Sequence, residues 1–155
     1  MTKDRRGFQY GLEPVLKLKE WEVNDLYQEL AGHNASVKEQ QAKVDSLAQA
    51  IASARTELIK QRQNKALINI DVQRMAHMYM LQMQNQQQQE SMQLQEMLQV
   101  RDDAQRRLNE VRKFVDNLEK NKEAMAHEFD LEAAKKEYQL SDDNWLQRMH
   151  WIKTT

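Results

Sequence analysis

The chain has 155 residues, of which three are glycine, one is proline and none is cysteine. Because tight turns are built mostly on Gly and Pro, this composition excludes a fold of many strands or many short helices and favours long helices. Its 23 basic and 24 acidic residues leave a net charge of −1, which excludes a sequence-wide attraction to nucleic acid or to an anionic membrane surface.

The apolar content predicts a thin core. Leu, Ile, Val and Phe together make up about a fifth of the chain, which is at the lower limit for filling a globular interior. We therefore expect one elongated domain over residues 1–155. The polar N-terminus does not read as a signal peptide, no long apolar run is present and cysteine is absent, so we expect a cytoplasmic protein without disulfides.

The first predicted helix spans about residues 14–62. Gly7 and Gly11 indicate a short irregular arm before it, and Pro14 suits the first helical position, where its missing N–H costs nothing. Seven aliphatic residues then recur at intervals of seven: Leu16, Val23, Leu30, Val37, Val44, Ile51 and Leu58. This is the a position of a coiled-coil heptad. The matching d positions are mixed: Lys19, Leu26, His33, Gln40, Leu47, Ala54 and Gln61. The sequence thus predicts a coiled-coil seam that is apolar on one side and partly polar on the other.

The turn after this helix has two candidate positions. Residues 63–71 lose the heptad and carry Asn64, Asn69 and Asp71, which tolerate turn geometry and can cap a following helix. The second candidate, residues 84–91, is rich in glutamine, which is a good helix former. We prefer the turn at 63–71 and expect 84–91 to be helical.

The second predicted helix spans about residues 72–140, followed by a short helical segment at 141–155. Its heptad run is Leu94, Met97, Arg101, Ala104, Leu108, Val111, Val115, Leu118, Lys122, Met125 and Phe129. Two such runs with a break between them predict an all-α fold, a long antiparallel two-helix coiled-coil hairpin, with parallel homodimerisation of each run as the alternative. Ser141 before two aspartates resembles an N-cap, which would open the last segment. That segment would carry Trp145, Leu146, Met149 and Ile152 on one face.

No arrangement of residues points to catalysis. The four histidines are far apart in sequence, no glycine-rich phosphate loop occurs, and a thin two-helix fold offers no water-excluding pocket. Met75, Met78, Met80 and Met83 could bind Cu(I), but they spread around more than half of a helix, which is more typical of an adaptable protein-binding surface. We therefore predict no catalytic, cofactor-binding or metal site.

One apolar stripe is a candidate for protein binding. Ile68, Val72, Met75 and Tyr79 repeat at helical spacing at the expected tip of the hairpin. The stripe either completes the hairpin core or forms a docking patch where no opposing helix covers it.

The segment FQYGLEPVLKLKEWE, Phe8 to Glu22, resembles the start of the FliJ/YscO family, the stalk proteins of flagellar and type III secretion export ATPases. The resemblance implies a non-catalytic coiled coil that sits in the pore of the hexameric export ATPase and couples it to the cytoplasmic domain of the membrane export gate; some relatives also bind export chaperones. It implies that the end carrying both termini enters the ATPase, which assigns Leu12, Leu16, Lys17 and Trp21 to that contact. The tip stripe would then meet the gate, and the protein would reach the membrane only through protein partners.

A different class of function also fits the pattern. A self-associating coiled-coil adaptor, or an escort chaperone for secreted substrates, would use the same heptads without any contact to an ATPase. The mass in solution separates the two hypotheses, because the stalk is expected to be a monomeric hairpin and the adaptor a long parallel dimer.

Overall fold

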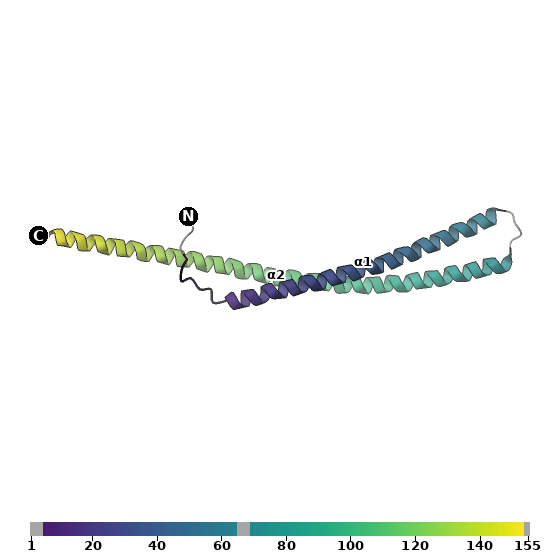
Figure 1. Cartoon of the computed structure of the whole chain (residues 1–155), viewed down its shortest axis with the longest axis horizontal. Coiled ribbons are helices and arrows are strands. Elements are labelled where there is room, and N and C mark those ends of the chain that lie inside the picture. Colours follow the sequence, from purple (N-terminus) through teal and green to yellow (C-terminus); the bar gives the residue numbers. More distant parts are fainter. Residues whose placement is uncertain (1–4, 65–68, 154–155) are drawn as a thin grey trace. The chain divides into compact units, whose positions relative to one another are not determined.

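A computed structural model describes residues 5–64 and 69–153 of the chain. It contains two helices, α1 (Glu13–Gln63) and α2 (Ile70–Lys153), and no strand among the described residues (Figure 1). The helices pack against each other in opposite directions. The predicted all-α helical hairpin with a short irregular N-terminal arm is therefore confirmed.

The break between the helices falls at residues 64–69. Residues 65–68 lie outside the described residues, but the start of α2 is clear: the backbone N–H of Asp71 donates to Oδ1 of Asn69 at 3.0 Å. A side chain that accepts from the second helical N–H is an N-cap, which satisfies one of the donors left free at a helix start. The alternative turn at 84–91 is excluded, because these residues are inside α2.

The predicted N-cap at Ser141 is wrong. Helix α2 runs without interruption through this position to Lys153, so residues 141–153 continue α2 and form no separate segment. Ser141, Asp142 and Asp143 are all exposed. Exposed side chains hydrogen-bond to water, so these three need no capping partner. Ser and Asp destabilise a helix only modestly, and with no Gly or Pro nearby this effect is too small to end a helix of this length.

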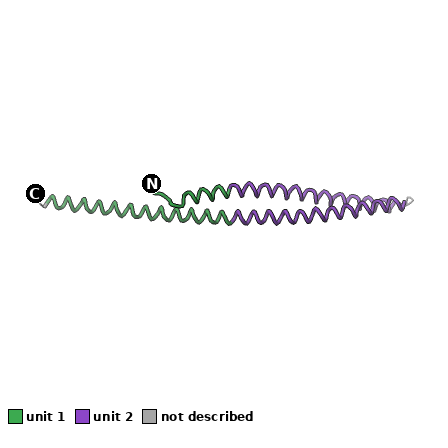
Figure 2. The backbone as a smooth tube through the Cα atoms, turned by 90° about the horizontal axis from the view of Figure 1, so that it is seen from below, with its two compact units in different colours: residues 1–23, 110–155 green, residues 24–109 purple. Residues whose placement is uncertain are grey.

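The chain divides into two compact units (Figure 2): residues 1–23 with 110–155, and residues 24–109. Within the second unit, Glu29 contacts Arg107 and Gln40 contacts Glu90, so sequence numbers rise along one helix as they fall along the other. Within the first unit, Leu16 packs with Val115 and Leu118, and Glu13, three residues earlier, pairs with Lys122. Both units are therefore antiparallel helix pairs.

The heptad predicted for α1 is confirmed. All seven of its aliphatic a positions are buried or half-buried, and so are six of the seven d positions; Gln61, the last of them, is exposed. Burial of such a stripe against a second helix is the main source of stability for a pair of this kind, because the isolated helices would be marginal in water.

The predicted α2 heptad holds as far as Lys122, fails at Met125 and is met again at Phe129, which is half-buried. Met125 is 43% exposed, whereas its neighbour Ala126 is 2% exposed. The Lys122 ammonium lies 2.6 Å from Oε2 of Glu13, the first residue of α1. Beyond this level the partner of α2 is the irregular arm and no longer a helix. The buried or half-buried positions of α2 now follow in steps of four: Lys122, Ala126, Asp130 and Ala134. The buried face therefore includes Ala126 in place of Met125.

Candidate interaction surfaces

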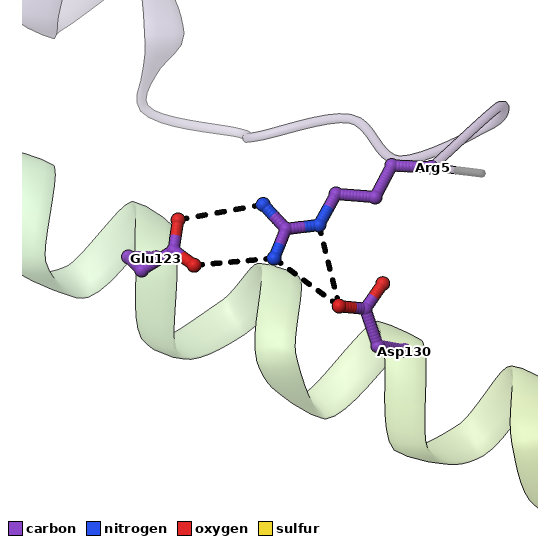
Figure 3. A network of polar contacts seen from close by, with 3 residues as sticks. All are labelled: Arg5, Glu123 and Asp130. Carbon is purple, nitrogen blue, oxygen red and sulfur yellow. Dashed lines mark hydrogen bonds and ion pairs between the residues drawn. The ribbon is translucent and has the colours of Figure 1, made fainter. Parts of the chain in front are cut away.

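The N-terminal arm is held along α2 by an ionic contact at Arg5 (Figure 3). Its guanidinium Nη2 lies 3.1 Å from Oε1 of Glu123 and 3.1 Å from Oδ2 of Asp130, and Nε donates to the same Asp130 oxygen at 3.3 Å. The hydrogen bonds with Glu123 and Asp130 raise the pKa of Arg5 above its ordinary value, and the hydrogen bond from Arg5 lowers the pKa of Glu123. The arm thus carries a fixed positive charge between two carboxylates.

Two aromatic residues of the arm complete the attachment. The rings of Phe8 and Phe129 lie 5.7 Å apart, centroid to centroid, in a tilted arrangement that aromatic pairs favour. Tyr10 is buried, and its hydroxyl lies 2.9 Å from Oδ1 of Asn121 and 3.2 Å from the carbonyl oxygen of Leu118. The polar end of the tyrosine is therefore satisfied inside the contact, so the arm is a specific part of the fold.

Sequence reasoning missed these arm contacts. It predicted an irregular segment before Pro14 but no packing on α2. The available signal was the alternation of Phe8 and Tyr10, which places two large aromatic side chains on one side of an extended segment. The alternation does not show which residues the two side chains contact, so the packing of the arm on α2 could not be predicted from it.

The residues assigned to the ATPase contact do not all form a surface. Leu12 and Trp21 are 45% and 69% exposed, and Lys17 is exposed as well. Lys17 and Trp21 are four residues apart on α1 and therefore share a face. Leu16, in contrast, is 4% exposed and belongs to the core with Val115 and Leu118. Leu12, Lys17 and Trp21 are therefore open to solvent, while Leu16 holds α1 against α2.

The predicted tip stripe lies on an open face of α2. Val72, Met75 and Tyr79 are all more than 45% exposed, and Ile68 lies outside the described residues. The side of α2 that is half-buried in this region is a different one: Ala76, Met80 and Met83. The described part of the stripe therefore does not complete the hairpin core. Met75 and Tyr79 also line a surface groove together with Met78, Leu81, Gln82 and Asn85.

Polar residues interrupt the seam of the second unit. Gln40 is buried, and its Nε2 donates to Oε2 of Glu90 at 2.5 Å and to the Glu90 carbonyl oxygen at 3.0 Å. Towards the other end of this unit, Arg107 Nη2 lies 2.8 Å from Oε1 of Glu29, and His33 Nε2 lies 3.5 Å from the same oxygen. The Gln40–Glu90 and Arg107–Glu29 contacts tie particular residues of α1 to particular residues of α2, whereas the His33–Glu29 contact lies within α1.

The described residues contain neither a cluster of metal-ligating side chains nor a membrane-spanning helix. In the ranges 5–64 and 69–153, no group of three or more His, Asp or Glu side chains could hold a metal ion. Neither helix, over its described length, is apolar enough to cross a membrane.

The fold and its exposed surfaces define the class of this protein as an all-α helical hairpin with a packed N-terminal arm. Comparison with protein-family models, with curated proteins and with solved structures finds no match to the chain.

Proposed function

We propose that this protein is a member of the FliJ/YscO family and acts as the non-catalytic central stalk of a flagellar or type III secretion export ATPase. The observation that carries the proposal is the segment Phe8–Glu22, which resembles the start of that family. In this protein the segment provides two anchors of the fold, Tyr10 and Leu16, and the exposed residue Trp21. A segment that both anchors the fold and offers an exposed contact residue is constrained in sequence for two reasons, which supports the use of this motif to assign a family.

The proposed mechanism is conformational. A single asymmetric chain inside a sixfold ring contacts only some of the subunits at one time, so it stabilises their conformations unequally. Binding of the chain and of nucleotide are then coupled, and each changes the affinity for the other. Leu12, Lys17 and Trp21 are the proposed contacts to the hexameric ATPase in the first unit. Through them the chain would promote ATP hydrolysis.

The second proposed partner is the cytoplasmic domain of the export gate. The exposed residues Val72, Met75 and Tyr79 offer it an apolar docking stripe, and unbranched methionine side chains adapt readily to a partner's surface. The protein would then act at the cytoplasmic face of a bacterial secretion apparatus, attached to the membrane only through protein partners. Export chaperones are further candidate partners, by analogy with the family.

The test of the ATPase contact is the rate of ATP hydrolysis by the cognate hexamer as this protein is added. We expect stimulation that saturates, and loss of stimulation in Trp21→Asp, which places a charge on the proposed apolar contact. Circular dichroism should show unchanged helicity, because Trp21 is 69% exposed. Failure of the unmodified protein to stimulate hydrolysis at saturation would exclude the stalk role.

The gate contact is tested by direct binding of the gate's cytoplasmic domain. Val72→Asp should abolish binding while leaving stimulation of the ATPase intact, and Trp21→Asp should do the reverse. Val100→Asp is a matched control, because Val100 lies on the same helix and is 50% exposed, against 49% for Val72. Equal loss of binding in the Val72 and Val100 variants would show that the stripe is not the docking site.

A further inference from the structure

The C-terminal part of α2 runs on beyond the N-terminal arm of its unit (Figure 1). It carries a row of large apolar side chains that are exposed. Four of them follow at intervals of seven residues and are between 50% and 75% exposed: Leu131, Tyr138, Trp145 and Ile152. Residues seven apart share one face of a helix, so the four form a continuous stripe. The buried and half-buried aliphatic residues of α1 have the same seven-residue spacing.

The stripe continues an interface that the protein already uses. Along α2 the seam with α1 and the arm passes through Ala126 and Asp130, and half-buried Ala134 follows. Tyr138 comes next at the same step of four. The arm covers the earlier part of this seam, and the exposed continuation has the seven-residue spacing that pairs with a helix.

We propose that residues 127–152 pair with the same segment of a second copy of the chain, in antiparallel orientation, to form a symmetric dimer. A twofold axis makes such a contact self-complementary, because each residue pair occurs twice. With the axis between residues 139 and 140, Trp145 of one copy faces Ala134 of the other, and Tyr138 faces Ser141. Large side chains thus meet small ones, as close packing of two helices requires.

The charges beside the stripe favour this orientation. In the antiparallel pair, exposed Lys135 of one copy and exposed Asp142 of the other flank the seam on the same side, two positions out of level, and symmetry repeats the contact. A parallel pair would instead place Arg148 opposite its own copy in the seam and Glu137 beside Asp142. Like charges at such positions are unfavourable, and they select against the parallel alignment.

Sedimentation equilibrium of the full-length protein tests whether the dimer exists. This inference does not rest on the proposed function, and none of its measurements involves an ATPase. The dimer is a state of the free protein, because it buries the end of the chain that the proposed stalk, as a monomer, inserts into the ATPase. We expect a reversible equilibrium between the 18.4 kDa monomer and a species of twice that mass. Trp145→Lys should shift it to monomer without loss of helicity, because this side chain is 59% exposed. An unmodified protein that stays monomeric at all accessible concentrations overturns the proposal.

Charge reversal tests the register. Lys135→Asp or Asp142→Lys alone should weaken the dimer about tenfold, because two attractive contacts become repulsive. The double variant should recover the unmodified affinity within about twofold. Asp143→Lys is the control, since it makes the same charge change at a neighbouring position that points away from the seam. Equal weakening by Asp143→Lys, or no recovery in the double variant, would rule out this register.

Disulfide formation tests the orientation, since the chain contains no cysteine of its own. In the antiparallel register, position 152 of one copy lies beside position 127 of the other. A mixture of Ile152→Cys and His127→Cys chains should therefore oxidise to the mixed dimer, and Ile152→Cys alone should remain reduced. Rapid cross-linking of Ile152→Cys with itself would show a parallel pair and overturn the proposal.

Discussion

The buried amide of Gln40 donates two hydrogen bonds to a single residue of the opposite helix, Glu90, through its carboxylate and its backbone carbonyl oxygen. A glutamine in a coiled-coil seam stabilises less than a leucine would. It is satisfied, however, only when the two helices are aligned in one register, because a slip along the seam leaves the amide buried without partners. The pair therefore specifies the alignment of α1 and α2 in this unit.

We predict that Gln40→Ala lowers the free energy of unfolding by about 1.5–3 kcal/mol, the range for a hydrogen bond to a charged group. Urea denaturation followed by circular dichroism measures the change. Gln41→Ala is the matched control, because Gln41 is exposed and its side chain bonds to Asp45 within its own helix, so its loss should cost less than about 0.5 kcal/mol. Similar losses in the two variants would refute the register role of Gln40.

Most of the fold could be predicted from sequence because its interactions are periodic. The seven-residue spacing from Leu16 to Leu58 defines the buried face of α1, and the scarcity of Gly and Pro leaves the helices free to run on. The arm could not be predicted in this way, because Arg5, Phe8 and Tyr10 bind residues more than 100 positions away in the sequence. Those contacts also explain why Met125 was wrongly predicted to be buried. The heptad spacing assumes that the partner is a helix, whereas the partner of α2 at this level is the irregular arm.

The shift of the α2 seam leads to a second prediction, at Ala126. Ala126→Met should destabilise the protein by about 1–3 kcal/mol, because the larger side chain enters a site that is already closed. Met125→Ala should change the stability by less than about 0.5 kcal/mol, since Met125 is 43% exposed. Thermal or urea unfolding of the two variants compares them directly. A larger loss of stability in Met125→Ala than in Ala126→Met would show that Met125, and not Ala126, is the buried position.

A third prediction separates packing from partner binding at Leu16. Leu16→Ala should lower the free energy of unfolding by about 2–5 kcal/mol, because it leaves a cavity beside Val115 and Leu118. Leu18→Ala is the control, because Leu18 is 61% exposed two residues further along the same helix and should cost less than about 0.5 kcal/mol. Urea denaturation measures both changes. A stable Leu16→Ala protein would show that this side chain is not part of the core.

The final prediction concerns the pH dependence of the arm. The ordinary pKa of a glutamate is 4.5, and hydrogen bonding to Arg5 lowers that of Glu123. A carboxyl group whose pKa is lower in the folded state stabilises that state above its ordinary pKa, and this contribution is lost as the pH falls through the lowered value. We therefore expect the arm to remain attached at neutral pH and to loosen in acid, as the pH falls below 4.5 and through the lowered pKa of Glu123. The NMR shifts of the Phe8 ring, which packs on Phe129, report the attachment, and the carboxyl carbon shift of Glu123 reports its titration. In Arg5→Gln the midpoint for Glu123 should rise towards its ordinary value. An unchanged midpoint in that variant would show that Arg5 is not the cause of the shift.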